Sequence, residues 1–123
     1  LVDAIESGYR MFDCAEYYIN EEGIGEAIAR CNVPRKDLFL ISKVWNTTVY
    51  KGEAAIREAV QTTLKALRTD YLDLYLIHWP VVGKHVAAYK VLEKLHEEGI
   101  IRAIGVANYT IEDYEALKRE MKI

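Results

Sequence analysis

The 123-residue sequence has few cysteines and no long apolar run, and each shortage excludes a class of protein. Cys14 and Cys31 are too few for a disulfide framework and fit no metal-ligand spacing. We therefore expect two free thiols in a reducing compartment, and no metal site. The longest apolar stretch, residues 72–82, is interrupted by Asp73 and His78, so it is too short and too polar to span a bilayer.

Positive charge is also scarce. The 16 Lys and Arg residues stand against 19 Asp and Glu, which gives a formal net charge of −3. Without a basic run, nothing in the sequence indicates a nucleic-acid or membrane partner. The sequence shows no basic and apolar leader, so we expect a cytoplasmic protein. Apolar residues make up 51% and charged residues 28%, which is ordinary for a folded domain and excludes intrinsic disorder.

What the sequence does contain is a regular alternation of short apolar segments with segments of helical periodicity. Strands are predicted over residues 9–13, 38–44, 71–78 and 100–107, and helices over 1–7, 21–31, 53–68, 86–98 and 112–121. The second strand is apolar almost throughout, as is typical of parallel sheets covered on both faces. The alternation has no linker, so it predicts one α/β domain over residues 1–123 with a parallel sheet and right-handed crossovers.

Local signals predict two helix starts. Asn20 precedes the helix at 21–31 and is a residue type that favours the N-cap position. Thr110 and Asp113 have the spacing of a capping box, with Asp in the N3 place, ahead of the last helix.

Each predicted strand is followed by, or ends in, a polar residue: Asp13, Lys43, His78 and Asn108, at similar intervals. Ligands of parallel α/β proteins bind at the carboxyl ends of the strands. A single such residue is commonly a solvated loop residue, and a lone histidine is commonly a hydrogen-bonded core residue. Four in succession favour one shared site.

The residue types suggest a reaction. An aspartate keeps a neighbouring lysine charged, and a lysine ammonium close to a tyrosine hydroxyl lowers the pKa of that hydroxyl from about 10. Such a tyrosine can act as a general acid, and a neutral histidine can orient a substrate oxygen. The set predicts proton donation to a carbonyl oxygen, and a cofactor is required because no residue supplies a hydride. The sequence has no nucleophile elbow and no glycine-rich phosphate loop.

The sequence resembles the aldo-keto reductases in a series of motifs in fixed order along the whole chain. These are GYR at 8–10, FDCA at 12–15, YINE at 18–21, SKVWN at 42–46, DYLDLYLIHWP at 70–80, LEKL at 92–95, EG at 98–99 and GVANY at 105–109. The resemblance implies an eight-stranded (β/α)8 TIM barrel, of which the chain carries about half, family strands two to five. It also implies reduction of aldehydes and ketones with NADPH, or less often NADH.

The resemblance also implies roles for five residues. Tyr18 is the expected general acid and Lys43 the residue that activates it. Asp13 pairs with Lys43 and lies on the cofactor side, His78 orients the substrate carbonyl, and Asn108 binds the nicotinamide carboxamide.

Three aromatic residues are less certain in role. Trp45 and Trp79 fall where the family often lines its substrate pocket, although packing at the barrel rim is an equally good interpretation. Tyr17 competes with its neighbour as the acid, but it fits the motif spacing less well and is interpreted as a packing residue.

The sequence departs from the family in two ways. Ala107 stands where the family usually has serine, which removes a hydroxyl contact worth about 1 kcal/mol. The match also lacks the first family strand and strands six to eight, which carry a ring-stacking tyrosine, a glutamine and the 2′-phosphate site.

Four strands cannot close this barrel, so two edges and an apolar inner face would be open. Two alternatives follow: two halves self-associate through their edges, or the chain is an inactive piece of a longer enzyme.

Three functions remain open from the sequence. The first is a carbonyl reductase, of which this is the catalytic half. The second is a non-enzymatic aldo-keto-like binding or assembly module. The third is a small flavodoxin-like domain for a phosphorylated ligand, which fits the length but lacks the phosphate-binding glycines.

Overall fold

Four parallel strands form a single sheet in the computed structural model, which describes all residues from 1 to 123. They are β1 (Met11–Asp13), β2 (Phe39–Val44), β3 (Leu72–Ile77) and β4 (Ile101–Val106). The strands lie in the order β1-β2-β3-β4, so each pairs with the next in the chain. A doubly wound, flavodoxin-like sheet reverses its strand order, so this order excludes that alternative.

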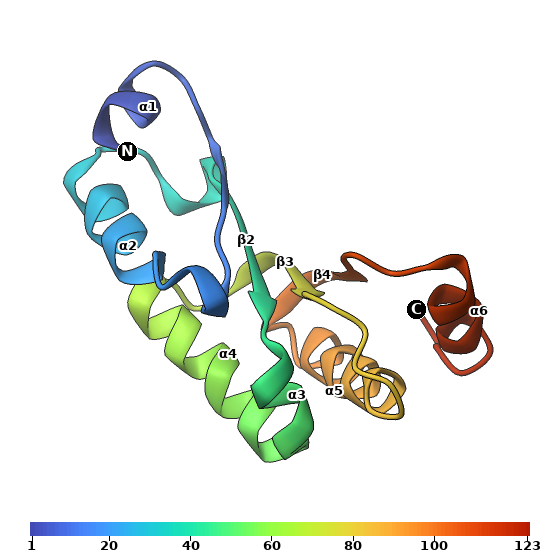
Figure 1. Cartoon of the computed structure of the whole chain (residues 1–123). Coiled ribbons are helices and arrows are strands. Elements are labelled where there is room, and N and C mark those ends of the chain that lie inside the picture. The colour runs from blue at the N-terminus through green and yellow to red at the C-terminus, as the bar shows by residue number, and fades with distance from the viewer.

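Six α-helices and two short 3₁₀ turns connect and flank the strands. The helices are α1 (Val2–Glu6), α2 (Glu21–Arg30), α3 (Asn46–Lys51), α4 (Glu53–Leu67), α5 (His85–Glu97) and α6 (Ile111–Lys118), and the turns are η1 (Glu16–Tyr18) and η2 (Arg35–Asp37). Figure 1 shows α2, α4 and α5 along one face of the sheet, with no helix against the other. None of the helices combines the length and the apolar character that crossing a membrane requires.

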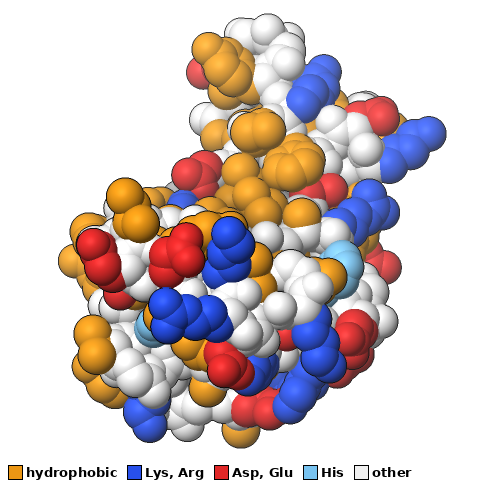
Figure 2. Space-filling model, turned by 90° about the vertical axis from the view of Figure 1, so that its right-hand side faces the viewer, with side chains coloured by type: hydrophobic (Ala, Val, Ile, Leu, Met, Phe, Trp, Pro, Cys, Tyr) orange, Lys and Arg blue, Asp and Glu red, His pale blue; other side chains and the backbone are white.

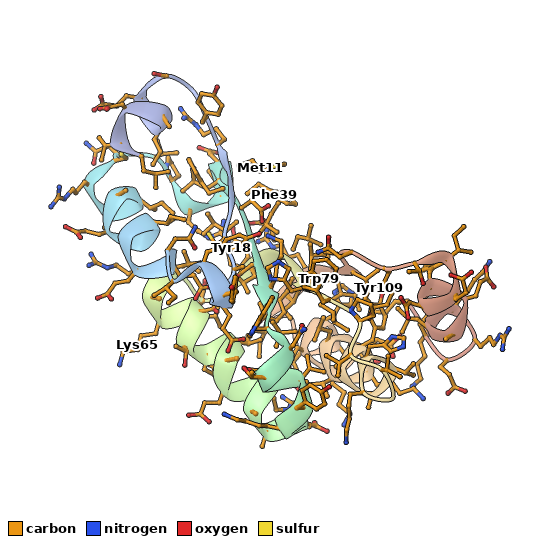
Figure 3. The ribbon with its side chains drawn as sticks, viewed as in Figure 1. Met11, Tyr18, Phe39, Lys65, Trp79 and Tyr109 are labelled. Carbon is orange, nitrogen blue, oxygen red and sulfur yellow. The ribbon has the colours of Figure 1, made fainter.

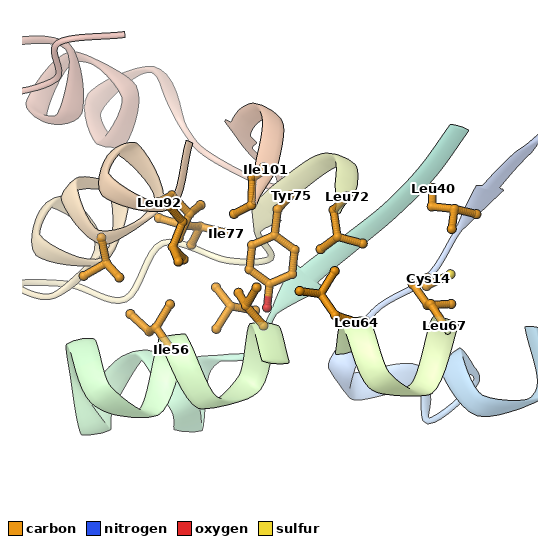
Figure 4. Packing of buried hydrophobic residues seen from close by; sticks show 14 of the residues in the cluster. Cys14, Leu40, Ile56, Leu64, Leu67, Leu72, Tyr75, Ile77, Leu92 and Ile101 are labelled. Atoms are coloured by element: carbon orange, nitrogen blue, oxygen red, sulfur yellow. The ribbon is translucent and has the colours of Figure 1, made fainter. Parts of the chain in front are cut away.

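The core lies between the sheet and these helices. Leu40, Tyr75 and Ile77 point from the strands toward the helices and are fully buried. Figure 4 shows Tyr75 between the strands and α4, packed among aliphatic side chains. Each such side chain contributes about 1.5–3 kcal/mol when it leaves water. Where α2 crosses α4, Gly25 is required, because a Cβ atom there would lie 2.0 Å from the Ala66 carbonyl oxygen.

The opposite face of the sheet has no cover. Alternate strand residues point to it, and the largest of them, Met11 and Phe39, are 60% and 37% exposed. The two lie close together near the amino ends of β1 and β2 (Figure 3). In Figure 2 hydrophobic side chains gather at the neck between the narrow upper part and the wide lower part of the molecule. The arrangement is that of an open half barrel, with β1 and β4 as its edges.

The local predictions had mixed outcomes. The capping box of Thr110 and Asp113 is confirmed, with both reciprocal hydrogen bonds present. Asn20 does occupy the N-cap position of α2, but the prediction of a capping side chain is wrong. Its backbone is helical rather than extended, and its side-chain oxygen is buried without a partner. The short helix α3 was not predicted, because six residues show no clear apolar period.

Candidate active site

An ion pair between Lys43 and Asp13 joins the ends of the first two strands. The Lys43 ammonium donates to Asp13 Oδ1 and, at 3.0 Å, to the carbonyl oxygen of Cys14. The Lys43 side chain is 7% exposed, whereas that of Asp13 is 58% exposed. A buried ammonium is tolerated when its charge is paired and its protons are bonded, so these two contacts keep Lys43 in place. The predicted pairing of the two residues is therefore present.

Cys14 follows Asp13 directly and lies beneath the ion pair. Its side chain is fully buried, and burial together with the nearby Glu21 and Asp13 carboxylates raises the pKa of the thiol to about 12. Neither Cys14 nor Cys31 forms a disulfide, as predicted.

Tyr18 ends the turn η1 and lies beside both Lys43 and His78. The Lys43 nitrogen is 5.0 Å from the centre of the Tyr18 ring, and the ring meets His78 edge-on at 5.4 Å. Tyr18 itself is 47% exposed, so part of this residue can contact a ligand. The next residue, Ile19, has a φ of +52°, a left-handed conformation that is strained for a β-branched residue. The backbone therefore turns sharply just after the predicted acid.

His78 directly follows β3 and is enclosed by aromatic rings. Tyr18 and Trp45 meet it edge-on at 5.4 and 5.1 Å, and Tyr17 does so at 6.5 Å. Burial, helped by the charge of Lys43, lowers the pKa of His78 below its ordinary 6.5. The ring is therefore neutral at pH 7, with one N–H to donate. Its Nδ1 atom is buried without a hydrogen-bond partner.

Asn108 lies at the carboxyl end of β4. Its φ of +59° is in the left-handed region that asparagine tolerates better than most residues. The side-chain amide donates from Nδ2 to the His78 carbonyl oxygen at 2.8 Å, which ties the ends of β3 and β4 together. The amide oxygen of this exposed residue stays available as an acceptor.

The two tryptophans differ in their surroundings. Trp45 is partly buried and belongs to the aromatic group around His78, where Tyr17 stacks on it at a ring distance of 4.0 Å. Trp79 is 45% exposed and lies between Tyr18 and Tyr109 in the view of Figure 3. Tyr17 does pack, as interpreted from the sequence, yet more than half of its surface remains exposed.

One residue beside these rings was missed in the sequence. Glu16, the first residue of η1, accepts hydrogen bonds from the Trp45 backbone N–H at 2.8 Å and from the Thr48 hydroxyl at 2.5 Å. Nothing in the local sequence marks this link, because the partners are far apart in the chain.

The structure thus brings Asp13, Tyr18, Lys43 and His78 together at one rim, with Asn108 bonded to the strand end that carries His78. The group combines a tyrosine hydroxyl from the turn η1 with a paired ammonium and a neutral imidazole from the strand ends. It can give a proton to a substrate oxygen and hold the charge that remains.

Comparisons with known proteins agree with the motifs. The model of the aldo/keto reductase family matches residues 1–123. The glyoxal reductase of Bacillus subtilis (strain 168) is 45% identical over 120 residues, which cover 98% of this chain and 43% of that protein. The methylglyoxal reductase DkgA of Escherichia coli (strain K12) is 43% identical over 116 residues, which cover 93% of this chain and 41% of that protein.

Solved structures also superpose on the chain. An aldo-keto reductase from a Medee basin deep-sea metagenome library matches with a TM-score of 0.93 and 42% identity, over 99% of this chain and 44% of that one. An aldo-keto reductase complexed with NADPH matches with a TM-score of 0.90 and 29% identity, over 99% and 41%.

The chain spans less than half the length of these relatives. The prediction of an α/β fold with parallel strands, equivalent to part of a (β/α)8 barrel, is confirmed. On its motifs, its fold and the match over its whole length, the chain belongs to the aldo/keto reductase family.

Proposed function

We propose that the residues of this chain carry out the NADPH-dependent reduction of small aldehydes and ketones, with Tyr18 as the general acid. The observation that supports the proposal most directly is the convergence of Tyr18, His78 and the Lys43–Asp13 pair at one end of the sheet. Relatives named glyoxal and methylglyoxal reductases suggest small dicarbonyl compounds as the first substrates to test.

Each residue has one task in this reaction. When bound, the reduced nicotinamide supplies a hydride to the carbonyl carbon. Tyr18 gives its hydroxyl proton to the carbonyl oxygen, so the C=O double bond becomes C–O with one new C–H and one new O–H bond. The Lys43 ammonium stabilises the tyrosinate left behind, and Asp13 keeps that ammonium in place. Neutral His78 donates a hydrogen bond to the substrate oxygen and orients it.

Asn108 fits the nicotinamide end of the cofactor. Its amide nitrogen is occupied by the His78 carbonyl oxygen, which fixes the side chain and leaves the amide oxygen as an acceptor. A carboxamide offers N–H donors that such an acceptor can bind. We propose Asn108 and Asp13 as this chain's contribution to the nicotinamide site.

The test is Tyr18→Phe in the full-length polypeptide, assayed by NADPH oxidation with methylglyoxal. Loss of the acid should lower kcat at least ~100-fold, while NADPH binding, followed by its fluorescence, stays nearly unchanged. Tyr9→Phe is the matched control, because Tyr9 is exposed and precedes the amino end of β1, whereas Tyr18 follows the carboxyl end of that strand. Retained turnover in Tyr18→Phe would remove Tyr18 from this role, and a wild-type protein that reduces no carbonyl would overturn the proposed function.

A second candidate function is assembly, favoured by the uncovered inner face of the sheet. We propose that a second copy of the chain pairs through the β1 and β4 edges and covers Met11 and Phe39. Sedimentation of the chain should then show a dimer that Met11→Lys dissociates. Ile111→Lys, an equally drastic change at an exposed apolar residue of α6, should leave the dimer intact. A monomer at all concentrations contradicts this candidate.

A further inference from the structure

Glu16 links two βα units at the candidate active site. Its carboxylate accepts from the Trp45 backbone N–H through Oε2 and from the Thr48 hydroxyl through Oε1, at 2.8 and 2.5 Å. Trp45 is the N-cap residue of α3 and makes no capping bond with its own side chain. Glu16 therefore satisfies an N–H group at this helix start from a different part of the chain.

The same short turn carries the predicted acid. Tyr17 follows Glu16 and stacks on the Trp45 ring, with 23° between the ring planes. Tyr18 comes next and meets His78. Glu16 thus contacts the backbone of Trp45 and Tyr17 contacts its ring, and Tyr18 is the next residue of the same turn.

The strain after Tyr18 makes such contacts necessary. Ile19 keeps its left-handed backbone only if the surrounding structure fixes the chain, since that conformation costs about 1–3 kcal/mol. Backbone hydrogen bonds from Tyr18 N–H to the Ala15 carbonyl oxygen and from Ile19 N–H to the Glu16 carbonyl oxygen fix the turn from within. The side-chain contacts that fix it against Trp45 and Thr48 are the two hydrogen bonds of Glu16 and the ring stack of Tyr17. Without them the turn could relax and move the Tyr18 hydroxyl.

We propose that Glu16 is a positioning residue, whose carboxylate couples the Tyr18 turn to Trp45 and so sets the aromatic wall around His78. The proposal rests on the proposed function for its effect on turnover. Its structural part, the tie between Glu16 and Trp45, stands independently of any reaction.

The activity test uses Glu16→Ala and Glu16→Gln in the full-length polypeptide. Glu16→Ala should lower kcat about 10- to 100-fold, because small displacements of a catalytic group have effects of this size. Glu16→Gln should restore most of the rate, since its amide oxygen can still accept from the Trp45 N–H. Glu22→Gln is the control, an exposed glutamate in the first turn of α2. A purely structural role would lower the melting temperature of Glu16→Ala and leave kcat unchanged, which would overturn the proposal.

A spectroscopic test does not depend on turnover. In the 123-residue chain with Trp79→Phe, Trp45 is the one remaining tryptophan, so its emission reports on the stack with Tyr17. Glu16→Ala should change the wavelength and the intensity of this emission. Glu22→Gln should leave both unchanged. Unchanged emission in Glu16→Ala overturns the tie itself. If the wild type reduces no carbonyl compound but Glu16→Ala still changes the Trp45 emission, the proposed function is overturned and the contact between Glu16 and Trp45 is supported.

Discussion

Each end of the sheet carries an ion pair with one buried member, but the surroundings of the two pairs differ. At the amino end, Asp73 accepts from the Leu40 backbone N–H at 2.9 Å and from Arg35 at 2.7 Å, with Arg102 at 3.8 Å. The guanidinium groups of Arg35 and Arg102 both lie over the Tyr71 ring, at 3.9 and 3.8 Å. Arg35 also donates to the Leu38 and Tyr71 carbonyl oxygens and to the Thr69 hydroxyl. This end therefore keeps its carboxylate and guanidinium occupied within the protein.

At the carboxyl end of the sheet, several polar groups have no partner within the protein or are exposed. Asp13 and Tyr18 are partly exposed, the Nδ1 atom of buried His78 has no partner, and Asn108 retains a free amide oxygen. Exposed polar groups without a full set of protein partners can bind a ligand, whereas the groups around Asp73 are already bonded within the protein. The comparison indicates that the amino end stabilises the fold, whereas the carboxyl end carries the residues of the proposed reaction, as in barrel enzymes generally.

The largest expected effect is at the amino end. Asp73→Ala should lower the free energy of unfolding by about 3 kcal/mol, because it leaves the Leu40 N–H and the Arg35 guanidinium without their acceptor. Urea unfolding of the chain measures this. Asp70→Ala, at an exposed position before the same strand, should change the free energy by less than about 0.5 kcal/mol. Equal effects in the two variants would contradict the assigned role of Asp73.

At the carboxyl end, Lys43→Met should act on rate more than on stability. We expect kcat to fall about 100-fold, or about 2.7 kcal/mol in the activation barrier. The loss of stability should be smaller than that of Asp73→Ala, because the carboxylate left behind, Asp13, is 58% exposed and stays solvated. Lys65→Met is the control, since Lys65 projects from α4 far from Tyr18 (Figure 3). A loss of stability as large as that of Asp73→Ala would abolish the distinction between the two ends.

The dependence of stability on pH should reflect His78. Because its pKa is lowered in the folded protein, the unfolded chain binds a proton more readily at this residue. The contribution of His78 to stability is thus present above pH 6.5 and is lost as the pH falls toward the folded pKa. The free energy of unfolding of the wild type, minus that of His78→Gln, should decrease between pH 7 and 5. A difference that stays constant with pH would show that burial does not perturb this histidine.

The smallest effect should come from Arg102→Ala. Its side chain is 59% exposed and its nitrogen lies 3.8 Å from Asp73, so the pair is screened by solvent. Urea unfolding should show a loss of less than about 1 kcal/mol, well below that of Arg35→Ala. A larger loss of stability for Arg102→Ala than for Arg35→Ala would contradict this prediction.

Periodicity was enough to predict a parallel α/β sheet with polar residues at its strand ends, whereas the (β/α)8 barrel and the role of Tyr18 came from the resemblance to the aldo-keto reductases. The apolar pattern located the four strands, and the position of Lys43 and His78 at strand ends placed them at one edge. The sequence pattern could not show which contacts a side chain makes when its partners lie far away in the chain. Asn20 has the right type for a cap, but the backbone arriving from η1 orients it otherwise. Asp73 was visible only as an interruption of an apolar strand, since its partners Arg35 and Arg102 come from elsewhere in the chain.

The buried thiol of Cys14 has a consequence for chemical durability. A cysteine with a pKa of about 12 and no solvent access carries almost no thiolate at neutral pH, and thiolate is the form that electrophiles and oxidants attack. Small carbonyl compounds, the proposed substrates, are themselves electrophiles. The Cys14 thiol, although it lies next to Asp13 at the rim, is therefore a poor target for such compounds.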